Sequence, residues 1–320
     1  MATAELTKTR HFLRVSDVDA SELELLLELA EDMKEDPRSY CETLRAETVA
    51  MFFEKPSTRT RSSFAAAAYR LGAMPLLLRP DELQLGRGEP IADTARVLSS
   101  YASAIVIRTF AQSELEEVAA NASVPVINAL SDAHHPCQAL ADLLTVRERF
   151  GSLRGRRLAF VGDGNNVAHS LIEAGALSGM QIAIATPPGY EPDAGVVEGA
   201  RQRASENHAI LLLHDPVEAV VDADVVYTDV WVSMGEDEER RERLHDLGPY
   251  QVTAELMRRA KVDAIFLHCL PAHRGEEVTA EVIDGPRSLV WQQAANRLPT
   301  EQALLYALVT GSWHPPGKRE

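Results

Sequence analysis

The segment from Ser57 to Arg61 carries three hydroxyl and two guanidinium side chains within five residues, Ser-Thr-Arg-Thr-Arg. These groups donate many hydrogen bonds, and arginine can engage two phosphate oxygens at once. The segment follows an apolar run at Thr48–Phe53, which predicts a buried strand, and precedes an alanine-rich helix at Ser62–Leu71. The first turn of a helix has unpaired backbone N–H groups and the positive end of the helix dipole, and both attract anions. The pattern therefore predicts a phosphate-binding turn. The plain alternative is capping by Ser or Thr.

Other polar residues also stand at or just after the ends of predicted strands. Arg108 ends the strand Ala104–Arg108, although an arginine there is otherwise simply exposed to solvent. His135 and Gln138 lie three residues apart at a helix start, so one helical face presents both side chains. In isolation, His135 and Gln138 could also simply cap the start of this helix.

The segment Gly162–Asn166 follows a strand, opens a helix and suggests a dinucleotide-binding turn. The corresponding fingerprint requires a third glycine where Val167 stands. The next strand, Gln181–Ala185, ends without the acidic residue that would bind a ribose. A nicotinamide-dependent enzyme is therefore a weakly supported hypothesis for this chain. A non-catalytic phosphate-binding module is another hypothesis.

Two more segments carry chemistry near the end of the chain. Asp229 follows a strand and precedes Ser233, so this loop offers an acidic group and a hydroxyl to a cationic amino acid; helix capping by Asp229 is the alternative. Cys269 follows the strand Ala264–His268. A buried cysteine is usually a small hydrophobe, and the sequence shows no base that would activate Cys269 as a covalent nucleophile.

Strands and helices alternate along the chain, which predicts an α/β fold with two domains, each built on a mainly parallel sheet flanked by helices. Ligands of such sheets bind beyond the carboxyl ends of strands, where the polar residues above gather. We expect one domain at residues 1–135, a connecting helix at 136–150 and a second domain at 151–298. A closing helix that begins near Pro299 and runs over 299–311 would complete the first domain.

Composition sets outer limits on function. A hydrophobic content of 45% and a charged content of 25% are typical of globular proteins, and 320 residues suit two domains. The net charge, 32 minus 48 or −16, argues against nucleic-acid binding, and no apolar run is long enough to span a membrane. Three widely spaced cysteines favour the cytoplasm, and no His/Cys/Asp cluster has the sequence spacing of metal ligands.

Taken together and in this order, the segments resemble the aspartate/ornithine carbamoyltransferase family over roughly residues 8 to 311. The resemblance implies transfer of a carbamoyl group from carbamoyl phosphate to the side-chain amine of L-ornithine, giving citrulline in arginine metabolism, with no cofactor or metal. Carbamoyl phosphate would be bound by Ser57, Thr58, Arg59, Thr60, Gln84, Arg108, His135, Gln138, Cys269, Leu270 and Arg297. Ornithine would be bound by Asn166, Asp229, Ser233 and Met234. Catalysis would rest on Arg59, Arg108, His135 and Cys269.

The resemblance also implies a homotrimer, or a multiple of trimers, in which the loop Asp81–Pro90 brings Gln84 to a neighbouring subunit. A carbamoyltransferase for another amine, such as putrescine, is the alternative within the family. The chain departs from the family pattern near Arg297, because acidic residues that commonly precede this arginine are replaced by Gln292–Ala295. Pro299 is also expected to interrupt a helix that is often continuous.

Overall fold

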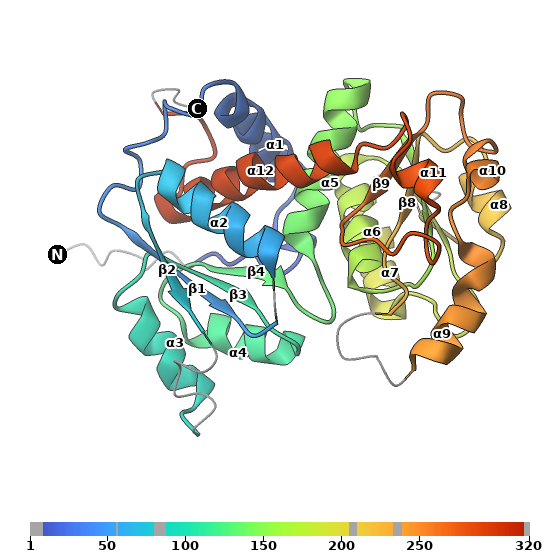
Figure 1. Ribbon diagram of the computed structural model, residues 1–320. Helices are drawn as coiled ribbons and strands as arrows, with labels where there is room; N and C mark the ends of the chain where they lie inside the picture. The colour runs from blue at the N-terminus through green and yellow to red at the C-terminus, as the bar shows by residue number, and fades with distance from the viewer. Residues whose placement is uncertain (1–8, 56, 80–87, 205–209, 233–238, 317–320) are drawn as a thin grey trace.

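The chain forms two parallel β-sheets, each flanked by helices, which lie side by side in Figure 1. The computed structural model describes residues 9–55, 57–79, 88–204, 210–232 and 239–316. Every pair of neighbouring strands in both sheets runs parallel. The predicted α/β class is therefore confirmed. Among the described residues, no helix combines the length and the hydropathy needed to cross a membrane.

The first sheet has four strands in the order β2-β1-β3-β4. Its strands are β1 (Thr48–Phe53), β2 (Met74–Leu78), β3 (Ala104–Arg108) and β4 (Val126–Leu130). Its helices are α1 (Ala20–Glu35), α2 (Thr58–Arg70), α3 (Ile91–Ser99) and α4 (Gln112–Asn121), after a short 3-10 turn, η1 (Val15–Asp17). Helices α3 and α4 cover one face, and α1 and α2 lie on the other (Figure 1). Side chains alternate between the two faces of a strand, so Ala50 packs toward α3 and α4 while Met51 packs toward α1 and α2.

The second sheet has five strands in the order β7-β6-β5-β8-β9. Its strands are β5 (Arg157–Val161), β6 (Gln181–Ala185), β7 (Ile210–Leu213), β8 (Val225–Thr228) and β9 (Ile265–His268). Its helices are α6 (Asn166–Ser178), α7 (Ala194–Arg203), α8 (Pro216–Val220), α9 (Arg240–Leu247), α10 (Ala254–Met257) and α11 (Ala280–Ile283), with a 3-10 turn, η3 (Gly248–Tyr250).

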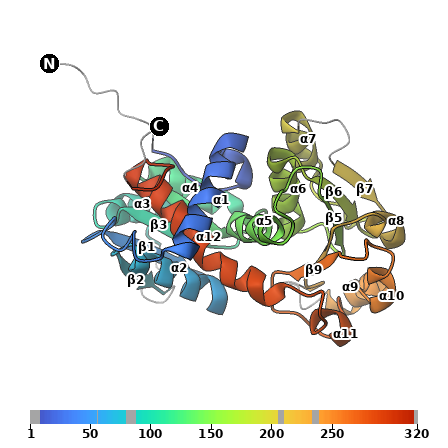
Figure 2. The same ribbon diagram turned by 90° about the horizontal axis from the view of Figure 1, so that it is seen from above.

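Two long helices join the sheets: α5 (Pro136–Phe150) and α12 (Val290–Thr310). Helix α5 is buried over most of its length, and α12 packs against it and against α1 and α2. Figure 2 shows α12 crossing from the second sheet to the first. The two sheets thus share a helical layer.

Two predicted helix starts are wrong. Helix α2 begins at Thr58, four residues before the expected Ser62, because its polar first turn hides the helical periodicity. Helix α12 begins at Val290 and continues through Pro299, so Pro299 does not start or interrupt it. A proline removes only its own N–H from the helical ladder, and burial of this stretch of α12 stabilises the continuous helix.

Each sheet reverses its strand order at one point, between β1 and β3 in the first sheet and between β5 and β8 in the second. A ligand of an open parallel sheet binds beyond the carboxyl ends of the strands at such a point. The segments that follow these strands include the residues with the chemistry described above.

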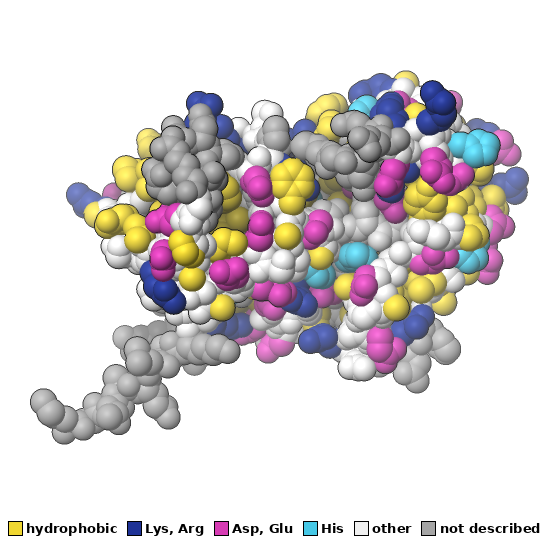
Figure 3. Space-filling view, turned by 90° about the horizontal axis from the view of Figure 1, so that it is seen from below, with side chains coloured by type: hydrophobic (Ala, Val, Ile, Leu, Met, Phe, Trp, Pro, Cys, Tyr) yellow, Lys and Arg dark blue, Asp and Glu magenta, His cyan; other side chains and the backbone are white. Residues whose placement is uncertain are grey.

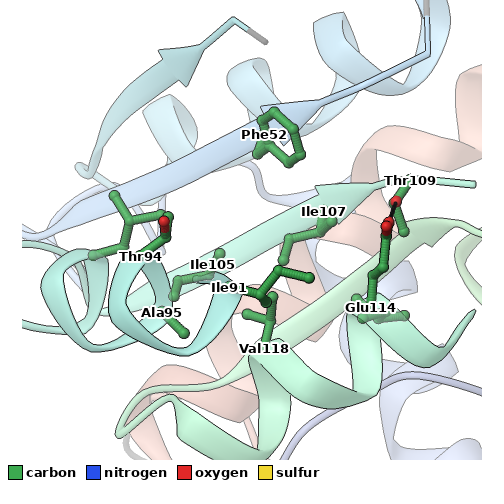
Figure 4. A pocket seen from close by; sticks show the side chains of 11 residues that line it. Phe52, Ile91, Thr94, Ala95, Ile105, Ile107, Thr109, Glu114 and Val118 are labelled. Atoms are coloured by element: carbon green, nitrogen blue, oxygen red, sulfur yellow. Dashed lines mark hydrogen bonds between the residues drawn. The ribbon is translucent and has the colours of Figure 1, made fainter. Parts of the chain in front are cut away.

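The first sheet also encloses an apolar cavity of about 50 Å³, between its strands and helices α3 and α4 (Figure 4). Phe52, Ile105 and Ile107 line it from the strands. Its polar edge is closed by Thr109 and Glu114, whose side chains are hydrogen-bonded at 2.8 Å. The cavity contains none of the predicted site residues.

Candidate active site

The predicted phosphate-binding turn is the amino end of α2. Ser57 is the N-cap residue, but its side chain makes no capping hydrogen bond, which weighs against the capping alternative. Thr58, Arg59 and Thr60 form the first helical turn, where backbone N–H groups have no partner within the helix. This turn therefore offers N–H groups, hydroxyls and a guanidinium to an anion.

Arg297, from the middle of α12, reaches the same turn. Its side chain is 3% exposed, and its Nη2 donates to Thr60 Oγ1 at 3.0 Å. Nη1 donates to Gln138 Oε1 at 2.8 Å, and Nε and Nη2 donate to Glu301 Oε1 at 3.0 and 2.6 Å. Burial opposes the charge of Arg297, but the adjacent Glu301 carboxylate raises the pKa of the guanidinium above its ordinary value. Arg297 is thus a charged group that joins α2, α5 and α12.

The orientation of the Gln138 amide follows from its two partners. Its oxygen accepts from Arg297, and its Nε2 donates to Asp142 Oδ1 at 2.8 Å. Asp142 also accepts from Gln293 Nε2 at 2.7 Å. Burial raises the pKa of Asp142 to about 7, while hydrogen bonds from Gln138, Gln293 and Tyr227 work in the opposite direction. The second N–H of Gln138 Nε2 remains available for a substrate oxygen.

His135 and Arg108 complete the group of polar residues on the side of the first sheet. Burial, together with the guanidiniums of Arg297, Arg108 and Arg59, lowers the pKa of His135 well below its ordinary value. His135 is therefore neutral and can donate a single ring N–H. Burial, aided by Arg297, lowers the pKa of Arg108 to about 10, so that side chain is still charged at neutral pH.

Asp229 follows β8 and has two polar partners from other segments. It is 6% exposed, and its Oδ1 accepts from Cys269 Sγ at 2.8 Å. Its Oδ2 accepts from Asn165 Nδ2 at 2.9 Å, and Asn165 itself caps α6 through Val167 and Ala168. Asp229 occupies no helix N-cap, so the capping alternative is wrong.

Cys269 carries a protonated thiol in this arrangement. Burial and the carboxylate of Asp229 raise its pKa well above the ordinary value, and the thiol donates to that carboxylate. A thiolate is the nucleophilic form of cysteine, so these surroundings disfavour covalent catalysis by Cys269. The neighbouring Leu270 carbonyl accepts a hydrogen bond from Arg59 Nη2, which connects the segment after β9 to the start of α2.

Asn166 is placed between the two sheets, where its Nδ2 donates to the Ser131 carbonyl oxygen at 2.6 Å. Gln84, Ser233 and Met234 lie outside the described residues. The supporting side chains of four residues were not among those predicted from the sequence: Asp142, Asn165, Gln293 and Glu301. Only Asn165 carried a sequence signal, as an Asn directly before a helical run.

The structure brings together a metal-ligand combination that sequence spacing did not indicate. Ligand atoms of Asp229, His268 and Cys269 lie within 4.8 Å of one another. Both ring nitrogens of His268 already have partners, however, since Leu270 N donates to Nδ1 at 2.9 Å and Nε2 lies 3.2 Å from Glu277 Oε1. The imidazole could bind a metal only by giving up one of these contacts.

Two family models cover nearly the whole chain. Residues 10–148 match the aspartate/ornithine carbamoyltransferase carbamoyl-P binding domain, and residues 154–308 match the Asp/Orn binding domain. The chain therefore belongs to the aspartate/ornithine carbamoyltransferase family.

Its relatives point to one branch of this family. It is 54% identical over 311 residues to the ornithine carbamoyltransferase of Anoxybacillus flavithermus, covering 96% of this chain and 99% of the relative. The ornithine carbamoyltransferase of Methanothermobacter thermautotrophicus is 56% identical over 301 residues, with 94% and 99% covered. The solved structure of the Pyrococcus furiosus ornithine carbamoyltransferase superposes with a TM-score of 0.89 at 50% identity, covering 97% of this chain and 98% of that one.

Proposed function

We propose that this protein transfers the carbamoyl group of carbamoyl phosphate to the side-chain amine of L-ornithine, giving L-citrulline and phosphate in arginine metabolism. The buried carboxylate of Asp229 is the observation that carries the choice of ornithine. It touches Cys269, whose neighbour Leu270 contacts the phosphate-binding turn through Arg59, so an acidic group stands beside the reaction centre. A carboxylate suits a cationic amino acid, whereas aspartate as substrate would require additional cationic groups there.

The reaction needs no covalent intermediate with the protein. The neutral amine attacks the carbamoyl carbon and a tetrahedral intermediate forms. The C–O bond to phosphate then breaks as the nitrogen passes a proton to an oxygen of the departing phosphate. Arg108, His135 and Gln138 donate hydrogen bonds to the carbamoyl oxygen as its negative charge grows. Ser57, Thr58, Arg59 and Thr60 hold the departing phosphate, and Arg59 and Arg108 offset its charge.

Arg297 acts in this scheme partly through other residues. Four of its five N–H donors are engaged by Glu301, Thr60 and Gln138, which leaves one N–H on Nη1 for carbamoyl phosphate. Asn166, Asp229, Ser233 and Met234 are assigned to ornithine, and Cys269 and Leu270 line the approach of its amine. Much of the rate enhancement comes from holding the two small substrates close together with their reacting atoms aligned.

The proposed division into domains follows the shared helical layer. Residues 1–135 form the carbamoyl-phosphate domain, 136–150 the connecting helix and 151–298 the ornithine domain. Residues 299–311 return to the first domain, which the edge-to-face contact of Tyr306 with Tyr40 supports, at 5.5 Å between ring centroids. The site then lies between the two domains.

We also propose a cytoplasmic homo-oligomer built on trimers. Strand β2 is an edge strand of the first sheet, and its apolar side chains from Leu76 to Leu78 are only partly buried. Natural proteins usually cover such an edge, and a neighbouring copy would do so. A cytoplasmic location fits the three cysteines, all of them free thiols. Acidic and basic side chains are interspersed on the face shown in Figure 3.

The decisive assay supplies carbamoyl phosphate with ornithine, putrescine or aspartate in separate reactions and measures the carbamoylated product. We expect turnover with ornithine to exceed that with the other two amines by at least about a hundredfold, and to survive exhaustive chelation of metals. Asp229→Asn should lose most activity with ornithine. Equal rates with putrescine would overturn the assignment of ornithine, and a requirement for a divalent ion would overturn the metal-free scheme.

A further inference from the structure

His268, the last residue of β9, links the site to a buried carboxylate that the scheme above does not use. Its side chain is 1% exposed, and Glu277 is completely buried. The ring contacts Leu270 N through Nδ1 at 2.9 Å and Glu277 Oε1 through Nε2 at 3.2 Å. The imidazole therefore stands between the backbone of the Cys269–Leu270 segment and Glu277.

These two contacts define the protonation of the ring. A backbone N–H can only donate, so Nδ1 of His268 accepts from Leu270 and carries no proton. The single proton of the neutral ring is then on Nε2, which donates to Glu277. A doubly protonated ring would place one N–H against another and break the contact with Leu270.

The Leu270 backbone adopts a conformation that requires such support. Its φ angle is +59°, in the left-handed region that leucine rarely occupies. Three hydrogen bonds hold the backbone of residues 268–270. His268 N donates to Gln293 Oε1 at 3.0 Å, Leu270 N donates to His268 Nδ1, and Arg59 donates to the Leu270 carbonyl oxygen. An unfavourable backbone conformation persists at a site when surrounding contacts over-determine it.

We propose that His268, held in one tautomer by Glu277, is a positioning residue for the carbamoyl transfer. It fixes the plane of the Cys269–Leu270 peptide, which directs the Cys269 thiol to Asp229 and the Leu270 carbonyl to Arg59. The part of the site assigned to ornithine and the part assigned to carbamoyl phosphate are thereby held in a fixed relative position. This inference rests on the proposed function, since it assigns a role within that reaction.

A matched pair of variants isolates the contact between the ring and the backbone. In His268→Asn, the side-chain oxygen can accept from the N–H two residues later, as in an Asx turn, and so replaces Nδ1. His268→Leu has a similar volume to histidine but no acceptor. Urea unfolding and circular dichroism establish that both variants are folded before kinetics are compared.

We expect His268→Leu to lose about a hundredfold in kcat with ornithine, because a small displacement of reacting groups costs that much. Its KM for carbamoyl phosphate should change by less than about tenfold, since no residue of the phosphate-binding turn on α2 is replaced. His268→Asn should keep kcat within about tenfold of the wild type. The inference is overturned if both folded variants lose kcat equally, or if His268→Leu is as active as the wild type.

A spectroscopic measurement separates this inference from the proposed function. In wild-type protein labelled with ¹⁵N-histidine, the signals that vanish in His268→Asn identify the ring, whose shifts should report a proton on Nε2 alone. A proton on Nδ1 contradicts the proposed role whatever the enzyme catalyses. If the wild type makes no citrulline, the proposed function fails even when the tautomer agrees.

Discussion

Arg297 and Glu301 form a buried ion pair one helical turn apart on α12, with 2.6 Å between Nη2 and Oε1. Glu301 is completely buried. The chain lacks the acidic residues that commonly precede this arginine in the family, and Glu301 supplies a carboxylate after it instead. Arg297 therefore does have a carboxylate partner on α12, although that carboxylate follows the arginine in the sequence instead of preceding it.

Removing this carboxylate should destabilise the fold. Glu301→Ala leaves the Arg297 guanidinium buried without a counter-charge, which costs about 3–5 kcal/mol in the free energy of unfolding. Urea unfolding at pH 7.5 measures the loss, and kcat/KM for carbamoyl phosphate should fall because Thr60 and Gln138 lose a fixed neighbour. The exposed variant Glu281→Ala serves as the control. An unchanged unfolding midpoint in Glu301→Ala would show that the pair contributes little.

Arg59→Lys should keep the fold and lose about 10- to 100-fold in kcat/KM for carbamoyl phosphate, because a point charge cannot bind phosphate through two parallel hydrogen bonds. Steady-state kinetics with ornithine saturating measure the effect. Arg70→Lys, at the exposed last turn of the same helix, is the matched control and should behave like the wild type. Wild-type kinetics in Arg59→Lys would count heavily against the phosphate-binding turn.

Cys269→Ala should weaken the use of ornithine without abolishing turnover, since the thiol contacts Asp229 and carries no carbamoyl group in the proposed scheme. We expect kcat/KM for ornithine to fall about tenfold, the effect of losing one hydrogen bond to a charged group. Mass spectrometry of protein quenched during turnover provides the second measurement. A carbamoyl adduct on Cys269 would demonstrate the covalent route instead.

The buried Asp142 predicts a pH-dependent stability. Its pKa is raised to about 7, so between about pH 4 and 7 the folded protein holds a proton that the unfolded chain has released. The contribution of Asp142 to the free energy of unfolding therefore falls as pH rises through this window. Relative to the wild type, Asp142→Asn should gain stability from pH 4 to 7 in urea titrations.

Asp284 provides a control of opposite sign for that measurement. Its hydrogen bonds from Arg274 lower the pKa of the exposed carboxyl, so its stabilising contribution is lost only as pH falls through the acidic range. Asp284→Asn should thus show no relative gain between pH 4 and 7. The assignment of the slope to Asp142 fails if both variants respond alike.

The proposed trimer predicts complementation between two inactive variants. Gln84, which lies outside the described residues, is assigned to the site of a neighbouring subunit, whereas Arg59 acts in its own. Gln84→Ala and Arg59→Ala, unfolded and reassembled together, should regain activity, because some mixed assemblies contain one site with both residues intact. Native mass spectrometry verifies the mixed assemblies. If these form and stay inactive, Gln84 does not act across subunits.

The sequence predicted individual elements better than the contacts between them. Strands β1 and β3 have the expected bounds, because a short apolar run is a local signal. The start of α12 was missed because Pro299 is itself a strong signal for a helix start. That part of the helix is stabilised by tertiary contacts, such as that of Gln293 with Asp142, 151 residues away.

The same limit applies to the site. Residue types at strand ends led us to propose Arg108 and Asp229 as site residues, because parallel strands all direct their carboxyl ends to one edge. The side chains that contact Asp229 come from distant segments, those of Asn165 and Cys269, and no periodic pattern indicates them. Three carboxylates are buried on predominantly apolar helix faces or loops, those of Asp142, Glu277 and Glu301. The side chain that each one contacts can be identified only in the folded structure.

Helix α12 runs without a break from the second sheet to the first. Its 21 residues extend about 31 Å. Along this length, Gln293 lies beside β9 and Tyr306 lies beside Tyr40. A proline is the point of least bending stiffness in such a rod, and the Arg297–Glu301 pair straddles Pro299. A rotation of one sheet against the other that bent α12 at Pro299 would shift Arg297 directly. Arg297, which we propose binds carbamoyl phosphate, would thus respond to a relative motion of the two sheets.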